Sequence, residues 1–298
     1  MMSGLLGRRW KGYGILLFTL ALGFFILTRL DRSTLQDSNR DSHKDSEQSD
    51  RHSAVKSESG EDSTPGWDLE QENPRLIERI SDVILPAADP KSILKISKEI
   101  QLGQVGQIEH VVSYFKNKKG GFFLEAGAFD GEYLSNTLYL EAQFNWTGIL
   151  IEPNREAFKT LITRNRKSKL LNSCLSVHRY SEEVTFDAAD VVGGILGDGP
   201  DTKGWVPADK RAKYRLRCFP LYSIIMALGN PKIDFMSLDI EGVELAVLET
   251  IPWSKVDIET LLIEVEHSNS AAISSILQSH GYRIDHMFGK QDIFYVKY

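Results

Sequence analysis

A hydrophobic strand followed by a turn between two glycines is the feature that most constrains the fold of this chain. The segment 122–131, FFLEAGAFDG, ends its apolar run at Glu125, and Gly127 and Gly131 bracket a turn into a helix. Glycine lets the backbone approach a ligand closely, and in a doubly wound sheet this turn lies at the carboxyl edge, where ligands bind. The spacing is not the Gly-x-Gly-x-x-Gly of dinucleotide enzymes, which argues against a nicotinamide-dependent oxidoreductase. An ordinary strand-to-helix turn is the alternative interpretation.

Acidic residues follow two further predicted strands. Glu152 ends the segment GILIE, and an acid at this position can accept hydrogen bonds from both hydroxyls of a ribose. Asp239 and Glu241 follow the strand 233–238, where they could act as a general base or as metal ligands. The alternatives are a solvated acid at a strand end for Glu152, and capping of the next helix for the pair.

Predicted strands alternate with predicted helices through the second half of the chain. This order favours an α/β fold with a mostly parallel, seven-stranded sheet covered on both faces, and the last two strands suggest an antiparallel hairpin at its edge. The predicted strands are 122–126, 148–151, 170–175, 184–186, 215–219, 233–238, 261–265, 282–286 and 293–296, and the predicted helices are 133–143, 155–166, 243–249 and 271–280.

The N-terminal third has a different composition. Residues 12–28 are apolar without a charge, and at about 1.5 Å per residue they span roughly 26 Å, enough for an early secretory membrane. The basic residues before them place segment 1–11 in the cytosol and the rest in the lumen, although a cleaved signal peptide is an alternative. A disordered, serine-rich stalk (29–66), a helical lead-in (67–104) and a globular domain (105–298) complete the expected organisation.

Charge and cysteine content exclude several classes of protein. The chain has 35 basic and 41 acidic residues, so a nucleic-acid binder that relies on bulk positive charge is not expected. Its two cysteines exclude a disulfide-dense scaffold and a four-cysteine zinc site, and no metal-ligand set is predicted. In an oxidising lumen Cys174 and Cys218 would form one disulfide, the alternative being two separate thiols. Asn145 begins a glycosylation sequon.

Three weaker features have open interpretations. The basic residues Arg164, Arg166, Lys167 and Lys169 are predicted to form a solvated face. The glycine-rich stretch 188–213 is either a lid beside the cleft or a surface loop. His267, at the predicted cleft edge, is interpreted as structural rather than catalytic.

Four segments, FFLEAGAFDGEYLSNT, ILIEPN, IDFMSLDIEGVELAVL and the closing GYRIDHMFGKQDIFYVKY, together resemble the FkbM-type methyltransferase domain over roughly 105–298. The resemblance implies a Rossmann-like class I methyltransferase fold, S-adenosylmethionine and O-methylation. It assigns Glu125, Gly127, Gly131 and Glu152 to the cofactor site and Asp239 and Glu241 to catalysis. Many members have a lysine two residues before the aspartate, and Ser237 replaces it here.

The anchor, the stalk and the segment SLDIEG are most similar to the Star-type branch of these proteins. That branch implies a single-pass type II membrane protein with a lumenal domain, resident in the endoplasmic reticulum, Golgi, endosome or plasma membrane. It also implies a role in transport of membrane-bound cargo, such as growth-factor precursors, from endoplasmic reticulum to Golgi or endosomes. The alternative is an active S-adenosylmethionine-dependent O-methyltransferase on an acceptor in the secretory pathway.

Overall fold

A computed structural model describes residues 66–96, 100, 105–189, 193–197, 206–207 and 211–298. The predicted cytosolic segment and membrane anchor, and all of the predicted stalk except Gly66, lie outside these residues. Within the described ranges, no helix has the length and apolar character that crossing a membrane requires.

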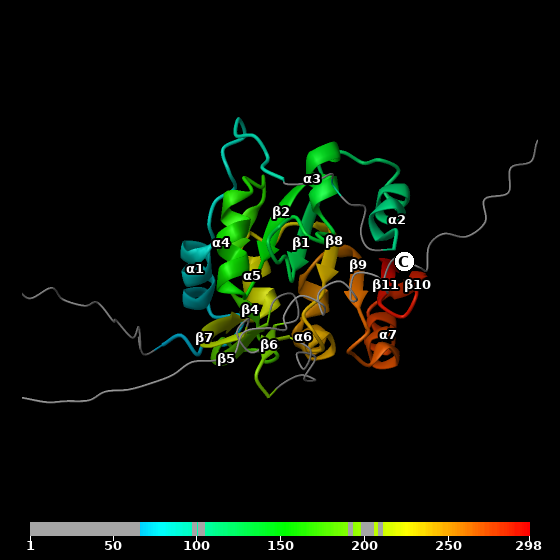
Figure 1. The fold of residues 1–298 in the computed structure, drawn as a ribbon. Coiled ribbons are helices and arrows are strands. Elements are labelled where there is room, and N and C mark those ends of the chain that lie inside the picture. The colour runs from blue at the N-terminus through cyan, green and yellow to red at the C-terminus, as the bar shows by residue number, and fades with distance from the viewer. Residues whose placement is uncertain (1–65, 97–99, 101–104, 190–192, 198–205, 208–210) are drawn as a thin grey trace, which may run out of the picture. The chain divides into compact units, whose positions relative to one another are not determined.

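A seven-stranded sheet forms the centre of the domain, with strand order β10-β11-β9-β8-β1-β2-β3 (Figure 1). Its strands are β1 (Phe122–Ala126), β2 (Thr147–Ile151), β3 (Lys169–Leu171), β8 (Ile233–Leu238), β9 (Ile258–Glu264), β10 (Tyr282–Phe288) and β11 (Asp292–Lys297). β1 pairs in parallel with β2 and β8, and the pairs β2–β3 and β8–β9 are also parallel.

The sheet is mixed, which corrects the expectation of a mostly parallel one. β11 runs antiparallel to both β9 and β10. The reason is the short turn at Gly289, which joins β10 to β11 and reverses the chain directly. The predicted antiparallel hairpin is therefore present, with β10 as the edge strand.

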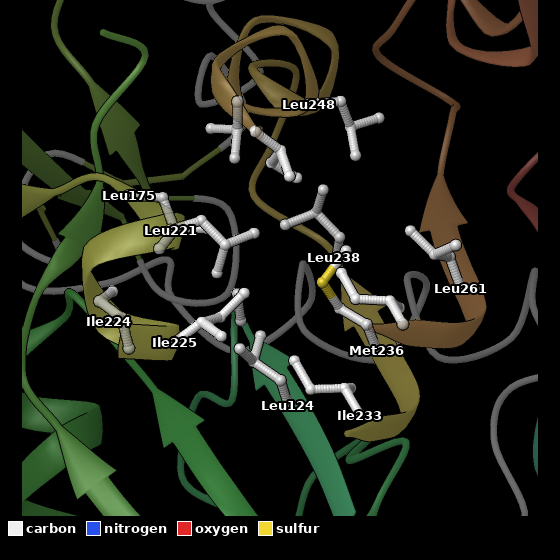
Figure 2. Close-up of a cluster of buried hydrophobic side chains, with 14 of the residues drawn as sticks. Leu124, Leu175, Leu221, Ile224, Ile225, Ile233, Met236, Leu238, Leu248 and Leu261 are labelled. Atoms are coloured by element: carbon white, nitrogen blue, oxygen red, sulfur yellow. The ribbon is translucent and has the colours of Figure 1, made fainter. Parts of the chain in front are cut away.

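Helices pack against both faces of the sheet because its central strands are apolar on both sides. One hydrophobic cluster joins the sheet to α1 (Pro74–Val83), α5 (Leu221–Ala227), α6 (Glu244–Thr250) and α7 (Ser270–Ser279). A second cluster joins its other face to α2 (Gln107–Tyr114), α3 (Leu138–Phe144) and α4 (Arg155–Thr163). Figure 2 shows part of the first cluster, including Leu124 of β1, Met236 of β8, and Leu221 and Ile225 of α5.

A separate four-stranded sheet, with order β4-β7-β5-β6, stands beside the carboxyl edge of the first and was not predicted as a unit. It consists of β4 (Cys174–Leu175), β5 (Glu182–Ala189), β6 (Gly194–Ile195) and β7 (Arg211–Phe219). Cys174 lies opposite Cys218 in the parallel pair β4–β7, and the two cysteines form a disulfide.

Asparagine side chains cap the first turns of three of the described helices, α1, α4 and α7. Asn154 caps α4 as expected, because its side chain accepts hydrogen bonds from the backbone N–H groups of Glu156 and Ala157. Among the described residues of the lead-in, only α1 is helical, and residues 84–96 continue without a helix. The predicted strand 170–175 is divided into β3 and β4, and α5 was not predicted. A 3₁₀ turn, η3 (Trp253–Lys255), precedes β9.

Candidate functional site

A cavity lies at the carboxyl ends of β1, β2 and β8, and it is called the main cavity below. It contains about 690 Å³ of empty space, part of which is open to solvent. Its lining comes from the turns after the three strands and from the second sheet: Ala126, Gly127, Phe129, Ile151, Glu152, Pro153, Asn154, Ser173, Cys174, Leu175, Phe186, Gly193, Gly194, Ile195, Asp239, Ile240, Glu241 and Val243. The order of the central sheet reverses between β1 and β8, and open α/β sheets bind ligands at such a point.

Gly127 brings the turn after β1 against the end of β8. Its φ angle is 87°, and a Cβ atom placed on it would lie 1.9 Å from the carbonyl oxygen of Asp239. The Gly127 N–H donates to the Ile151 carbonyl at 3.0 Å, which also ties the turn to β2. Only glycine satisfies both the backbone angle and the contact.

Glu152 is the acid at the tip of β2, and it is only 4% exposed. Its two carboxylate oxygens accept hydrogen bonds from the backbone N–H groups of Phe129, at 2.7 Å, and Asn154, at 2.6 Å. Burial raises the pKa of Glu152 to about 7, although the two backbone hydrogen bonds oppose the shift. Each carboxylate oxygen has a second lone pair, so Glu152 retains capacity to accept ligand hydroxyls from the main cavity.

Asp239 and Glu241 line the main cavity and also a second cavity. Burial raises the pKa of Asp239 well above its usual range, and repulsion from Glu241 and Glu264 adds to the shift. Glu244 holds this turn in place, because its carboxylate accepts from the backbone N–H groups of Ile240, at 2.9 Å, and Gly242, at 3.1 Å. Glu244, the first residue of α6, therefore fixes the backbone of the turn after β8. Asp239 and Glu241, in the same turn, line the two cavities.

Glu125 and Gly131 lie outside the lining of the main cavity, unlike the other predicted site residues. Glu125 is buried and accepts hydrogen bonds from the Ser135 hydroxyl at 3.0 Å, the Asn136 backbone N–H at 2.7 Å and the Thr137 hydroxyl at 2.5 Å. These bonds hold residues 135–137 in a turn, and α3 starts after it rather than at residue 133 as predicted. Glu125 and Gly131 thus shape the loop behind the cavity.

Arg166 contradicts the prediction of a solvated basic face. It is 1% exposed, and its guanidinium donates to the Gly131 carbonyl at 2.5 Å and to the Thr137 hydroxyl at 2.9 Å. Its Nε atom lies 3.1 Å from a carboxylate oxygen of Glu141. The side chain therefore links the turn after β1 to the start of α3, a role that the run of basic residues did not indicate.

The second cavity, called the acidic cavity below, contains residues that sequence reasoning did not single out. They are Glu264, Glu266 and Asp292, which line it together with Asp239, Glu241 and His267. The sequence offered one signal for Glu264: it is an acid at the end of a strand, β9, just as Glu152 is an acid directly after β2. The acidic cavity contains about 770 Å³ of empty space, part of it open to solvent.

Two further predictions have a place in the structure. Within the glycine-rich stretch, Gly193, Gly194 and Ile195 line the main cavity, while residues 198–205 lie outside the described ranges. Asn145 is exposed at the C-terminus of α3, with φ 56°, and its glycosylation stays a prediction.

Comparison with known proteins places this site in a family. The fold is similar to an S-adenosylmethionine-dependent methyltransferase from Aquifex aeolicus (14% identity, TM-score 0.34, 75% of this chain and 97% of that one). It is also similar to precorrin-6y C5,15-methyltransferase from Geobacter metallireducens GS-15 (11% identity, TM-score 0.36, 72% and 99%). No curated protein sequence matches the chain. The sequence profile of the Methyltransferase FkbM domain matches residues 125–284, which include the turn after β1, Glu152 and the Asp239–Glu241 pair. Because this match spans more than half of the 298 residues, the chain belongs to the FkbM methyltransferase domain family.

Proposed function

We propose that the main cavity binds S-adenosylmethionine and that the protein methylates an oxygen acceptor. The observation that carries the proposal is the convergence of Gly127, Glu152 and Asp239 on one cavity from the ends of three adjacent parallel strands. The empty space of about 690 Å³ falls within the range of about 300–1,000 Å³ that is usual for small-molecule sites. Family membership supports the choice of cofactor.

The donor and acceptor groups of the main cavity fit this cofactor. Glu152 is held by two backbone amides with its remaining lone pairs free for ribose hydroxyls. Phe129, Ile151 and Val243 provide apolar surface for the adenine ring. When bound, S-adenosylmethionine supplies an electrophilic methyl group. The close backbone contact between Gly127 and Asp239 fixes the position of the turn that carries Asp239 and Glu241.

Asp239 and Glu241 are the groups suited to take the proton that an acceptor hydroxyl loses. The raised pKa of Asp239 makes this carboxylate a stronger base than an exposed aspartate, because burial and neighbouring acids disfavour its charge. A base whose pKa is close to the working pH is the most effective in general base catalysis. Positioning of the acceptor makes the other contribution, since methyl transfer requires an in-line approach.

Calorimetric titration of the full-length chain with S-adenosylmethionine tests the proposal. We expect a Kd of micromolar order, and Glu152→Ala should weaken it by about 100-fold, because each lost hydrogen bond to a charged group is worth about 1.5–3 kcal/mol. Glu249→Ala is the matched control, since Glu249 is exposed on α6 and lines neither cavity. A melting curve establishes that each variant is folded. No heat of binding at millimolar cofactor would refute the proposal.

A second candidate function is transport of membrane-bound cargo within the secretory pathway by a lumenal, membrane-anchored domain. The Cys174–Cys218 disulfide favours it, because such bonds persist in oxidising compartments. Protease protection of a C-terminal tag in sealed microsomes tests the lumenal placement, and digestion of the tag would exclude it. Export of a transmembrane growth-factor precursor should then depend on the chain and should continue with Glu152→Ala if transport is independent of the cofactor.

A further inference from the structure

Acidic side chains are the main polar lining of the acidic cavity. Five carboxylates line it, from Asp239, Glu241, Glu264, Glu266 and Asp292, and among the described lining residues there is no lysine or arginine. Gln107 donates to Asp292 at 2.8 Å. Of the other four acids, Asp239 and Glu241 follow β8, and Glu264 and Glu266 lie at the end of β9. Like charges in one partly enclosed space repel one another, so an arrangement of this kind is stabilised by protons or by a bound cation.

Glu264 provides an independent indication of a ligand. The residue is 9% exposed, and one of its carboxylate oxygens accepts from the backbone N–H groups of Glu266 and His267, the latter at 3.2 Å. Its other oxygen, Oε2, is buried and has no hydrogen-bond partner in the described part of the chain. Burial of an unsatisfied carboxylate oxygen is costly.

Glu264 also belongs to a group of three side chains that could hold a metal ion together. Glu264, Glu266 and His267 can each offer one ligand atom, and the three atoms lie within 4.8 Å of one another. Opposite ligands of an octahedral ion are about 4.2 Å apart at metal–oxygen distances of about 2.1 Å. Glu266 and His267 are exposed, so small side-chain rotations can close the difference.

The turn after β9 brings Glu264, Glu266 and His267 together. The turn after β9 is closed by the bonds from Glu266 and His267 to the Glu264 carboxylate, and by a backbone bond from Ser268 to Val265 at 3.3 Å. His267 Nε2 also lies 3.9 Å from a carboxylate oxygen of Glu241, which brings the acid pair of β8 next to the same point.

We propose that the acidic cavity binds one divalent metal ion through Glu264, Glu266 and His267. Two carboxylates and one imidazole suit a borderline or hard ion such as Mn²⁺, Fe²⁺ or Zn²⁺, and they do not suit Cu⁺. Because Asp239 and Glu241 line both cavities, the ion lies next to the main cavity. If the proposed methyl transfer is correct, and on this point the inference rests on that proposal, the ion helps to hold an oxygen-bearing acceptor beside the methyl group.

Titration of the full-length, cofactor-free chain with Mn²⁺ tests the site, with the electron paramagnetic resonance signal of free Mn²⁺ as the readout. We expect one ion per chain. Glu266→Gln and His267→Ala should each weaken binding by at least about tenfold, and both positions are exposed, so folding should be retained. Glu264→Gln keeps an oxygen that accepts from the two backbone amides but removes the charge, and it should weaken binding similarly.

Glu249→Gln, an exposed acid away from both cavities, should bind Mn²⁺ like the parent chain. An undiminished free-ion signal at millimolar Mn²⁺ would overturn the metal site, and so would equal affinity in the parent and the three ligand variants. An organic cation as the occupant of the acidic cavity would give the first of these results. The titration contains no S-adenosylmethionine, so failure of cofactor binding would not affect its outcome.

Discussion

The Cα atom of Gly127 lies so close to the backbone of Asp239 that a Cβ atom on the glycine would be 1.9 Å from the aspartate carbonyl oxygen. This contact joins the turns that follow two adjacent strands, β1 and β8, and it sets the spacing between the glycine turn and the acidic pair. The geometry of the main cavity therefore depends on the absence of one side chain.

Gly127→Ala should destabilise the domain by about 2–4 kcal/mol, because it adds a steric clash to the cost of a positive φ angle. The matched control is Gly229→Ala, where φ is 85°, nearly equal to the 87° of Gly127, and a Cβ atom would meet nothing within 4 Å. The control should cost only about 1–2 kcal/mol. Urea unfolding of both variants measures the difference, and equal destabilisation would show that the Asp239 contact is unimportant.

Arg166→Met should lower the free energy of unfolding by about 3–5 kcal/mol, the usual effect of removing one partner of a buried ion pair. The variant removes the guanidinium that donates to the Gly131 carbonyl and the Thr137 hydroxyl and that pairs with the Glu141 carboxylate. Lys169→Met, an exposed position in the same basic run, should change stability by less than about 0.5 kcal/mol. Chemical denaturation of the two variants compares them, and similar stabilities would contradict a structural role for Arg166.

Reduction of the Cys174–Cys218 bond should destabilise the domain by about 2–4 kcal/mol, since the bond closes a loop with a sequence separation of 44. It should also weaken cofactor binding, because Cys174 and the adjoining Leu175 line the main cavity. Unfolding curves with and without a reductant measure the effect. A double Cys→Ala variant serves as the control and should not respond to the reductant.

The stability contribution of Glu152 should fall as the pH rises from about 4.5 to about 7. Burial raises its pKa to about 7 in the folded protein, so in this range the folded state keeps a proton that the unfolded state has released. At about 1.4 kcal/mol per pKa unit, the loss between pH 5 and pH 8 is about 2–3 kcal/mol. Urea unfolding at both pH values should show a smaller loss for Glu152→Ala than for the parent chain. Parallel pH profiles would show that Glu152 is not protonated in the folded state.

Local sequence patterns predicted much of the fold and singled out several residues that line the main cavity. The strands β1, β2, β8 and β9 and the Asn154 cap follow from apolar runs and from side chains that bond to their own backbone. The glycine turn and the acids after β2 and β8 were assigned to one cavity because parallel strands end at one edge. Gly127, Glu152, Asp239 and Glu241 all line it.

Other features depended on contacts between residues far apart in the chain. Arg166 looked like one of four surface cations, and only its burial beside Gly131 and Thr137 identifies it as internal. The second sheet forms because β5 pairs along its length with β7, a strand that lies further along the chain, and no local pattern specifies this partner. Glu264 is a further example, since one of its carboxylate oxygens is buried without a hydrogen-bond partner by packing that no local pattern specifies.

The sequence by itself determined the alternation of strands and helices, the glycine turn and the acids at the strand ends, because hydrophobic periodicity and backbone conformation act over a few residues. The tertiary structure alone decided which acids share a cavity, which cation is buried and which carboxylate oxygen lacks a partner. Burial and electrostatic repulsion are sums over neighbours from the whole fold, and the pKa values of Asp239 and Glu264 depend on those sums.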